Sequence, residues 1–354
     1  MIDVEGLHTT APPIGVAVIG CGRWGPNVVA HLDALPGAEM RRIIDLDELR
    51  IGALRRAHPG VEISTQLDDV LTDDGVSAVV VTTPAATHTD VARRALAGGK
   101  HVLVEKPLGT DVAQCEALVH DASGSGLVLM VGHHYLFHPA VRWIKCCLDR
   151  GDLGRLCYMT MRRLNLGPVR IDADAAWDLA AHDISIANHW LGRLPLAASA
   201  RSGAWLNETV ADTVDATLRY DGGVEVHIQV SWLYPKKTRE VALVGDRRMV
   251  LFDELATDTP LTVHESTLRP ELDVRQADRF AYQPCVGPVS TPCVPVDDAL
   301  RLECLHFLDC IRSGEPPLTD ARAGLDVVRV LEAITSSARQ GGHEVAVSGS
   351  RVCA

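Results

Sequence analysis

A glycine-rich run directly after an apolar segment constrains the fold of this chain more than any other feature. Residues 14–19 are almost entirely apolar, and Gly20-Cys21-Gly22-Arg23-Trp24-Gly25 follows them and opens a segment of helical character. In a strand–turn–helix unit such glycines allow a tight turn and a close approach of the backbone to a pyrophosphate at the helix N-terminus. The run therefore predicts a dinucleotide-binding loop.

The segment from residue 14 to about 132 alternates apolar runs with helical patterns. This alternation is typical of a parallel sheet wrapped by crossover helices. We predict a doubly wound Rossmann domain over residues 1–132, with residues 1–13 as a disordered tail. Its strands are expected near residues 14–19, 41–45, 78–82, 101–104 and 127–131.

Asp45 lies twenty residues beyond Gly25, at the end of the second predicted strand. A carboxylate there binds the ribose hydroxyls of the adenosine and repels a 2′-phosphate. The sequence thus favours NAD over NADP. Asp47 is an alternative for the same role, and Arg41 or Arg42 would be needed to accept NADP.

Residues 133–354 follow a different pattern and form the second predicted domain. Residues 224–231 alternate apolar and polar side chains, which is typical of a strand with one buried face. With a linking helix at about 139–150 and a hairpin turn at 221–223, we expect an α/β domain with an open, mainly antiparallel sheet. Further strands are expected at 156–163, 214–220, 239–245 and 249–253, an irregular arm at about 256–295, and helices at 297–311 and 321–338.

Charge and hydropathy exclude several classes of partner. The formal net charge is −12, whereas nucleic acids and anionic membrane surfaces require clustered Lys and Arg. No stretch approaches the roughly 18 uninterrupted apolar residues of a membrane span, and the N-terminal residues lack the pattern of a signal peptide. We expect a cytoplasmic protein. Its ten cysteines are scattered without paired CxxC spacing, which favours reduced, mostly buried thiols.

Lys106 stands directly after the strand predicted at residues 101–104, within Glu105-Lys106-Pro107. Ligands of such folds bind at this carboxyl edge of the sheet. A partly desolvated lysine near a positively charged nicotinamide has a lowered pKa, which makes proton exchange near neutral pH feasible. The alternative is a surface lysine paired with Glu105.

Asp178 and His182 are four residues apart and share one face of a predicted helix. A carboxylate beside an imidazole can orient it and stabilise its charge. Asp183 falls on the apolar stripe of the same helix and is expected to be a buried acid with a structural partner. The structural alternative for His182 is a histidine with no chemical role.

Two further groups of side chains are candidates for ligand binding. His133, His134 and His138 surround Tyr135, but they lack the spacing of a metal site, so no metal is expected. The arginines and the asparagine between residues 162 and 170 suit an anionic or hydroxyl-rich ligand, with solvated surface charge as the alternative. The predicted substrate-binding residues are His134, Tyr135, Arg163, Asn165 and Arg170.

Taken together, these motifs resemble the glucose-fructose oxidoreductase/inositol dehydrogenase (Gfo/Idh/MocA) family over nearly the whole chain. The resemblance rests on the glycine run, on Thr83-Pro84 with His88, on residues 97–108 and on residues 177–183. It implies a Rossmann domain followed by an α/β domain whose open sheet often forms the oligomer interface, here of a homodimer or homotetramer. The closing helices would pack back on the first domain.

The resemblance also implies roles for individual residues. Lys106, Asp178 and His182 would be the catalytic set, with His182 taking the hydroxyl proton while Asp178 and Lys106 position and polarise the same oxygen. Some relatives are thought to give the proton-transfer role to the lysine. The residues that would line the cofactor are Gly20, Gly22, Arg23, Trp24, Gly25, Asp45, Thr83, Pro84, His88, Glu105 and Lys106.

The expected activity is hydride transfer between NAD and a secondary hydroxyl of a pyranose or cyclitol. The stretch Arg162–Arg170 resembles members from nucleotide-sugar and glycan pathways, which act at carbon 3 of a hexose. Ser185 stands where many polyol-oxidising relatives have a second acid, which weakens the match to an inositol-like substrate. The alternatives are an NAD-dependent glycosidase, which oxidises carbon 3 only transiently, and a non-catalytic sugar or NAD sensor.

Overall fold

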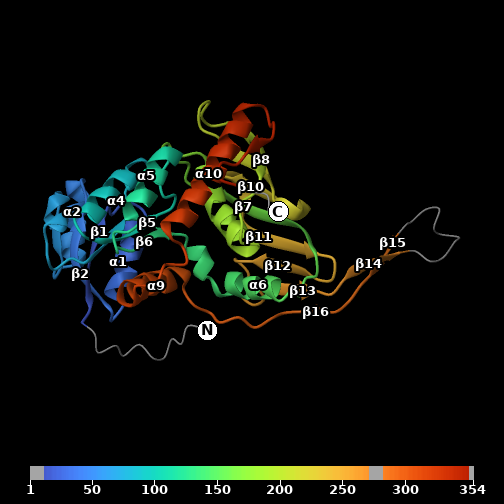
Figure 1. Ribbon diagram of the computed structural model, residues 1–354, viewed down its shortest axis with the longest axis horizontal. Coiled ribbons are helices and arrows are strands. Elements are labelled where there is room, and N and C mark those ends of the chain that lie inside the picture. The colour runs from blue at the N-terminus through green and yellow to red at the C-terminus, as the bar shows by residue number, and fades with distance from the viewer. Residues whose placement is uncertain (1–11, 271–281, 351–354) are drawn as a thin grey trace. The chain divides into compact units, whose positions relative to one another are not determined.

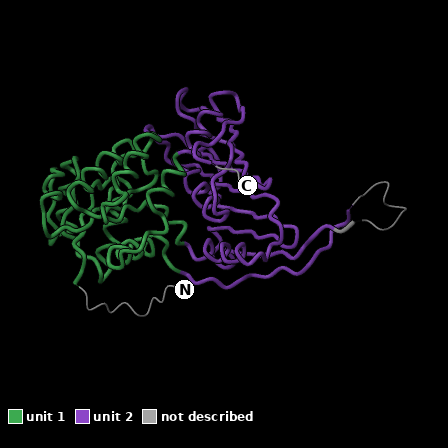
Figure 2. The backbone as a smooth tube through the Cα atoms, viewed as in Figure 1, with its two compact units in different colours: residues 1–137, 297–328 green, residues 138–296, 329–354 purple. Residues whose placement is uncertain are grey.

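The computed structural model describes residues 12–270 and 282–350, which form two compact units (Figure 2). Unit 1 consists of residues 1–137 and 297–328, and unit 2 of residues 138–296 and 329–354. The sequence predicted a division at residue 132, with closing helices that pack back on the first domain. In the structure residues 297–328 belong to unit 1, because α9 (Ala299–Ser313) packs on α1 (Gly25–Asp33) and on the 3₁₀ turn η2 (His134–Phe137). The predicted tail at residues 1–13 lies almost wholly outside the described residues.

Unit 1 is a Rossmann fold, as the sequence predicted. Its six strands are all parallel and lie in the order β3-β2-β1-β4-β5-β6. The strands are β1 (Ile14–Ile19), β2 (Ala38–Ile44), β3 (Glu62–Ser64), β4 (Ala78–Val81), β5 (His101–Glu105) and β6 (Leu129–Gly132). The crossover helices are α1, α2 (Glu48–Ala57), α3 (Asp68–Leu71), α4 (His88–Ala97) and α5 (Val112–Ala122) (Figure 1).

The central strands of unit 1 are buried on both faces. Val16, Val18, Val79 and Val81 have at most 1% of their surface exposed. Such continuous apolar strands occur where helices cover both faces of a parallel sheet. The chain order of the strands reverses between β1 and β4, so the carboxyl ends of these strands form the switch point where ligands of this fold bind.

Unit 2 contains one nine-stranded sheet in the order β16-β13-β12-β11-β7-β10-β9-β8-β17. All its pairs are antiparallel except β7 with β10, so the prediction of an open, mainly antiparallel sheet is confirmed. The strands are β7 (Leu156–Leu166), β8 (Ala197–Gly203), β9 (Thr213–Arg219), β10 (Glu225–Ser231), β11 (Leu233–Gly245), β12 (Met249–Asp253), β13 (Leu261–His264), β16 (Val289–Ser290) and β17 (Val345–Ala346). The helices are α6 (Pro139–Asp149), α7 (Ala181–Leu191) and part of α10 (Ala321–Arg339).

Two sequence predictions for unit 2 are wrong. The region from 256 to 295 is not only an irregular arm, because β13 joins the sheet and buries Leu261 and Val263. Beyond β13 the chain forms a separate pair, β14 (Thr267–Pro270) with β15 (Tyr282–Cys285). The helix expected through residues 177–183 is also not uniform, since a π-helical segment, η3 (Ala176–Ala180), precedes α7.

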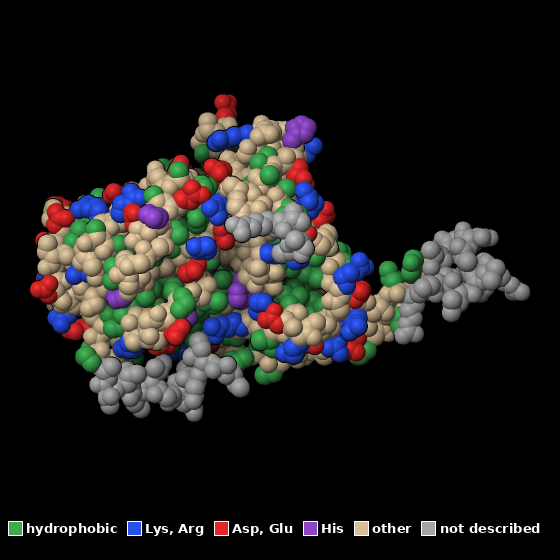
Figure 3. All heavy atoms as spheres, in the orientation of Figure 1, with side chains coloured by type: hydrophobic (Ala, Val, Ile, Leu, Met, Phe, Trp, Pro, Cys, Tyr) green, Lys and Arg blue, Asp and Glu red, His purple; other side chains and the backbone are tan. Residues whose placement is uncertain are grey.

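The surface carries both signs of charge. On the visible face, acidic and basic side chains are interspersed rather than gathered into one basic area (Figure 3). Within the described residues, none of the helices is both long enough and apolar enough to cross a membrane.

Candidate active site

The glycine loop of unit 1 is shaped by close backbone contacts. Gly20 has a φ of +92°, and a Cβ there would lie 2.9 Å from the backbone N of Thr83. A Cβ on Gly25 would lie 2.3 Å from the carbonyl oxygen of Gly20. Larger residues are therefore excluded at both positions. At Gly22 the nearest atom is 4.0 Å away, on the side chain of Arg50, so the protein leaves space over this glycine.

Asp45 holds the glycine loop in place. Its carboxylate accepts hydrogen bonds from the backbone N–H groups of Cys21, at 2.6 Å, and Asp47, at 2.9 Å. Arg50 lies 3.7 Å from the same carboxylate. Asp47, the alternative for ribose binding, instead caps α2, because its carboxylate accepts hydrogen bonds from the backbone N–H groups of Leu49 and Arg50. These contacts favour Asp45 as the acid beside the loop.

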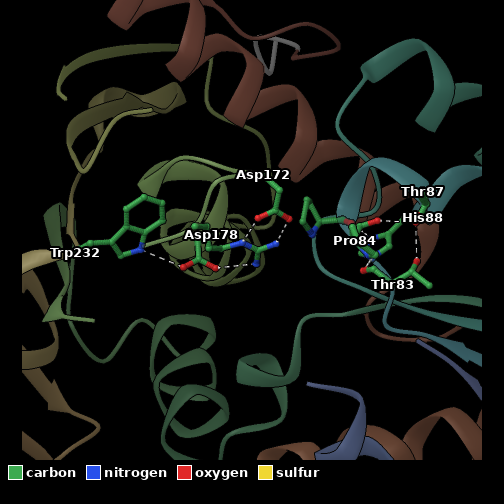
Figure 4. A network of polar contacts seen from close by, with 9 residues as sticks. Thr83, Pro84, Thr87, His88, Asp172, Asp178 and Trp232 are labelled. Carbon is green, nitrogen blue, oxygen red and sulfur yellow. Dashed lines mark hydrogen bonds and ion pairs between the residues drawn. The ribbon is translucent and has the colours of Figure 1, made fainter. Parts of the chain in front are cut away.

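His88 ties two other loops at this edge of the sheet together. Its Nδ1 lies 2.7 Å from the carbonyl oxygen of Pro107 and its Nε2 lies 2.8 Å from that of Thr83 (Figure 4). The side chain is buried at the start of α4. His88 therefore positions Thr83-Pro84 and the loop after β5, rather than offering its ring to a ligand.

Glu105 and Lys106 end β5 at the carboxyl edge of the sheet. The backbone N–H of Lys106 donates to Oε2 of Glu105, at 3.1 Å, and the following peptide bond to Pro107 is cis. Burial raises the pKa of Glu105 to about 7, although the charge of Lys106 opposes this rise. Glu105 is thus a carboxyl group that titrates near neutral pH, directly beside the predicted catalytic lysine.

The histidines that follow β6 differ from one another. His133 is 1% exposed, and burial, assisted by the charge of Lys106, lowers its pKa to about 3, so its ring is neutral. His134 lies between two aromatic rings, 5.6 Å from Trp24 and 4.4 Å from Tyr135. His134 and Tyr135 are half-buried in η2, so they remain candidates for ligand contact.

In unit 2 the carboxylate of Asp178 is held from two sides. Its Oδ2 accepts a hydrogen bond from the indole of Trp232, at 3.2 Å, and its Oδ1 lies 3.3 Å from the guanidinium of Arg170 (Figure 4). Arg170 is itself fixed by Asp172, at 2.6 Å. Asp178 lies in the π-helical segment, a feature that frequently occurs at functional sites. These contacts fix the orientation of the Asp178 carboxylate.

His182 lies in the first turn of α7 and is 8% exposed. Ser185, one turn later, donates its hydroxyl to the carbonyl oxygen of His182, at 2.7 Å. The hydroxyl of Ser185 is therefore bonded to the backbone of its own helix.

Arg163 and Asn165 have structural partners. Arg163 is 5% exposed and donates to Asp183, at 3.0 Å, with Glu254 at 3.6 Å. This contact supplies the partner that the sequence predicted for the buried Asp183. The side-chain amide oxygen of Asn165 accepts a hydrogen bond from the guanidinium of Arg239, at 2.7 Å. Among the predicted substrate residues on this stretch, Arg170 contacts the predicted catalytic side chain of Asp178.

Sequence reasoning missed Trp232 as the partner of Asp178. The two residues are 54 positions apart, and Trp232 stands in the short connection between β10 and β11. A tryptophan next to an alternating strand is expected to be a core residue, and Trp232 is 1% exposed. The π-helical segment was also missed, since it lacks the helix-breaking residues that mark an irregularity.

Family models match both parts of the chain. The model described as "Oxidoreductase family, NAD-binding Rossmann fold" matches residues 14–133, and that described as "Oxidoreductase family, C-terminal alpha/beta domain" matches residues 145–347. The chain belongs to the Gfo/Idh/MocA family. This confirms the resemblance inferred from the motifs and identifies the protein as an oxidoreductase.

Similar members of the Gfo/Idh/MocA family include enzymes of two substrate classes. The scyllo-inositol 2-dehydrogenase (NAD(+)) of Bacillus subtilis is 26% identical over 92% of this chain and 94% of its own. The UDP-N-acetylglucosamine 3-dehydrogenase of Acidithiobacillus ferrooxidans is 27% identical over 91% of this chain and 95% of its own. The crystal structure of a putative oxidoreductase from Magnetospirillum magnetotacticum has a TM-score of 0.78 and 32% identity, covering 91% of this chain and 99% of the other.

The residues of unit 1 fit the NAD of this Gfo/Idh/MocA protein. The protein leaves the space over Gly22 open just before the N-terminus of α1, where a pyrophosphate binds in this fold. Asp45 lies at the end of β2, where the adenosine ribose binds in this fold. The loop, the start of α1 and the acid that fixes the loop are thus the groups that would hold NAD.

Proposed function

We propose that this oxidoreductase transfers a hydride between NAD and a secondary alcohol or ketone of a sugar. The substrate classes are a pyranose, either free or nucleotide-linked and reacting at carbon 3, or a cyclitol. The observation that carries the proposal is Lys106 at the carboxyl end of β5 in an NAD-binding unit. The activities of the cyclitol and nucleotide-sugar relatives support the substrate classes.

The proposed mechanism assigns one task to each catalytic side chain. When bound, NAD supplies the acceptor for the hydride. His182 takes the proton of the substrate hydroxyl, and Asp178, held by Trp232 and Arg170, stabilises the charge that develops on the imidazole. Lys106 polarises the same oxygen through its ammonium group. In the direction of reduction the proton returns from His182 to the carbonyl oxygen.

A substrate panel tests the proposal. Cyclitols, free hexoses and nucleotide sugars are incubated with the protein and NAD, and reduced NAD is measured by its absorbance. We expect substrate-dependent reduction with at least one class. Release of free sugar without net formation of reduced NAD would instead identify a glycosidase. An inert protein that still binds NAD would identify a sensor.

We further propose that copies of the chain associate through the open face of the nine-stranded sheet, as a homodimer or homotetramer in the cytoplasm. This face has a depression of about 440 Å³ across β7, β10, β9 and β8, lined in part by Thr160, Thr217 and His227. It also exposes Tyr158 (41%) and Leu251 (46%). A flat sheet face with exposed large side chains is typical of a subunit interface. Light scattering tests the assembly, and cell fractionation tests the compartment.

A further inference from the structure

The loop between β8 and β9 of unit 2 is closed by a buried acid to which the proposed function gives no role. Asp212 is fully buried, and its Oδ2 accepts hydrogen bonds from the backbone N–H groups of Trp205, at 2.6 Å, and Leu206, at 2.9 Å. Its own backbone N–H donates to the carbonyl oxygen of Gly203, at 2.8 Å. The carboxyl group therefore ties the start of this loop to its end.

The other carboxyl oxygen of Asp212 is a cost to the fold. Oδ1 is buried and has no hydrogen-bond partner among the residues that the structure describes. An unpaired polar atom in the interior lowers stability. An apolar side chain would avoid this cost, but it would leave the N–H groups of Trp205 and Leu206 without their acceptor. The closure of the loop therefore depends on this acid.

The end of the loop holds two further segments on consecutive carbonyl groups. The carbonyl oxygen of Ala211 accepts a hydrogen bond from the backbone N–H of Ala175, at 2.9 Å. The carbonyl oxygen of Asp212 accepts one from the backbone N–H of Trp232, also at 2.9 Å. Ala175 directly precedes η3, the π-helical segment that contains Asp178. The same short stretch of backbone thus holds the start of the segment of Asp178 and the residue that donates to Asp178.

These two segments meet in one side-chain hydrogen bond. The indole N–H of Trp232 donates to Oδ2 of Asp178, at 3.2 Å (Figure 4). A hydrogen bond weakens steeply when its distance and angle depart from their best values. Freedom of movement in residues 211 and 212 would shift the donor segment and the acceptor segment relative to each other. The strength of this bond therefore depends on how firmly residues 211 and 212 are fixed.

We propose that Asp212 is a positioning residue for Asp178: by closing the loop, its carboxyl group fixes residues 211 and 212 and thereby sets the hydrogen bond from Trp232 to Asp178. This inference rests on the proposed catalytic role of Asp178. It explains why a buried position retains an acid with one unpaired oxygen, since residues that cost stability are commonly kept for function. Asp212 acts through the backbone and Trp232, and not on the substrate.

Substitutions of Asp212 test whether its acceptor oxygen is what matters. Asp212→Asn keeps a side-chain oxygen that can accept both N–H groups, so kcat should stay within about twofold of the parent protein. Asp212→Ala removes the acceptor, so kcat should fall about fivefold, the loss expected for one hydrogen bond, while KM changes less than about twofold. If the Ala variant does not fold, Asp212→Ser replaces it with the same expected loss, because its side chain is one bond shorter. An unchanged kcat in the variant without the acceptor would overturn the proposal.

A double variant tests whether the effect passes through Trp232. In Trp232→Phe the hydrogen bond to Asp178 is already absent, so adding Asp212→Ala should lower kcat by less than about twofold further. Losses that multiply in the double variant would show that Asp212 acts by another route, and the proposal then fails.

The matched control is another buried polar residue of unit 2. Ser337 is fully buried, accepts a hydrogen bond from the backbone N–H of Ala200, at 2.8 Å, and donates to the carbonyl oxygen of His343, at 2.7 Å. Ser337→Ala should lower the melting temperature and leave kcat and KM unchanged. A loss of kcat equal to that of Asp212→Ala would show a general effect of lost stability, which contradicts the positioning role.

Nuclear magnetic resonance tests the hydrogen bond without relying on activity. The chain has six tryptophans, so isotope labelling of tryptophan gives few indole signals, and Trp232→Phe identifies that of Trp232. We expect the indole N–H of Trp232 to exchange with solvent about fivefold faster or more in Asp212→Ala than in the parent protein. If no substrate is turned over, the proposed function fails, and this exchange rate alone decides the positioning role. An unchanged rate would overturn it.

Discussion

His182 is the residue at which substrate chemistry can be separated from cofactor binding. The groups that fit NAD, from Gly20 to Glu105, belong to unit 1, whereas His182 belongs to α7 of unit 2. We expect His182→Ala to lower kcat by about 10² to 10⁴-fold, the usual contribution of a general base. The dissociation constant of NAD, measured by fluorescence titration, should change less than twofold. His189→Ala, on the same helix, is the control, and an equal loss in both variants would argue for a structural histidine.

Trp232 allows a finer test of how Asp178 is positioned. Trp232→Phe keeps most of the buried ring but removes the N–H that donates to Asp178. The loss of one hydrogen bond of about 1 kcal/mol predicts a roughly fivefold lower kcat. KM should change little, because Arg170 still holds the other oxygen of Asp178. Trp205→Phe, at a side chain that is 76% exposed, should leave both constants unchanged. A rise in KM alone would show that Trp232 contributes to substrate binding instead.

At the scale of elements, the buried pair of Arg163 and Asp183 joins β7 to α7. Both side chains are at most 6% exposed, and neutralising Asp183 removes the nearer of the two carboxylates that pair with the buried Arg163. Asp183→Asn should therefore lower the free energy of unfolding by about 3 to 5 kcal/mol, measured by urea denaturation. Replacing both residues by apolar ones, Arg163→Met with Asp183→Leu, should recover most of the loss. A double variant as unstable as the single one would mean that the contacts to Glu254 and Arg239 dominate.

The elements that the sequence predicted well are those with a strong periodic signal. The strand at residues 14–19 and the strand at residues 249–253 have the predicted bounds, and the hairpin at Asp221-Gly222-Gly223 joins β9 to β10 as expected. Short strands such as β3 were missed, because a strand of three residues is too short to show an alternating pattern. β13 was missed because the prolines and threonines around it outweigh its two buried apolar residues.

The candidate site was predictable where a residue type and its place on an element suffice. Asp45, Lys106 and the glycine loop follow from strand ends, and the buried Asp183 follows from helical spacing. Contacts between distant segments do not follow from such rules. Arg163 fits an anionic ligand by composition, yet it pairs with Asp183, and one of the partners of Asp178 is Trp232, 54 positions away.

For the molecule as a whole, two units of different architecture divide the tasks of the enzyme. Unit 1 uses a parallel sheet, whose carboxyl edge gathers loops for a cofactor. Unit 2 uses a mostly antiparallel sheet, which allows one face to remain open. That open face is polar and regular, since Arg162, Gln229, Asp215 and Arg201 follow one another across four neighbouring strands. This row carries charges of both signs, which can pair with a matching surface on another copy.

The proposed assembly predicts the effect of one substitution at the centre of this face. Thr160 stands on β7, lines the depression, and pairs with His227 of β10 and Ala242 of β11. Thr160→Arg adds a long cation beside Arg162, so two copies that face each other would meet like charges and lose close packing. We expect the mass measured by light scattering to fall to that of the single chain, 38.2 kDa. Thr110→Arg, at an exposed position in unit 1, should leave the mass unchanged. An assembly that survives Thr160→Arg would place the interface on another surface of the molecule.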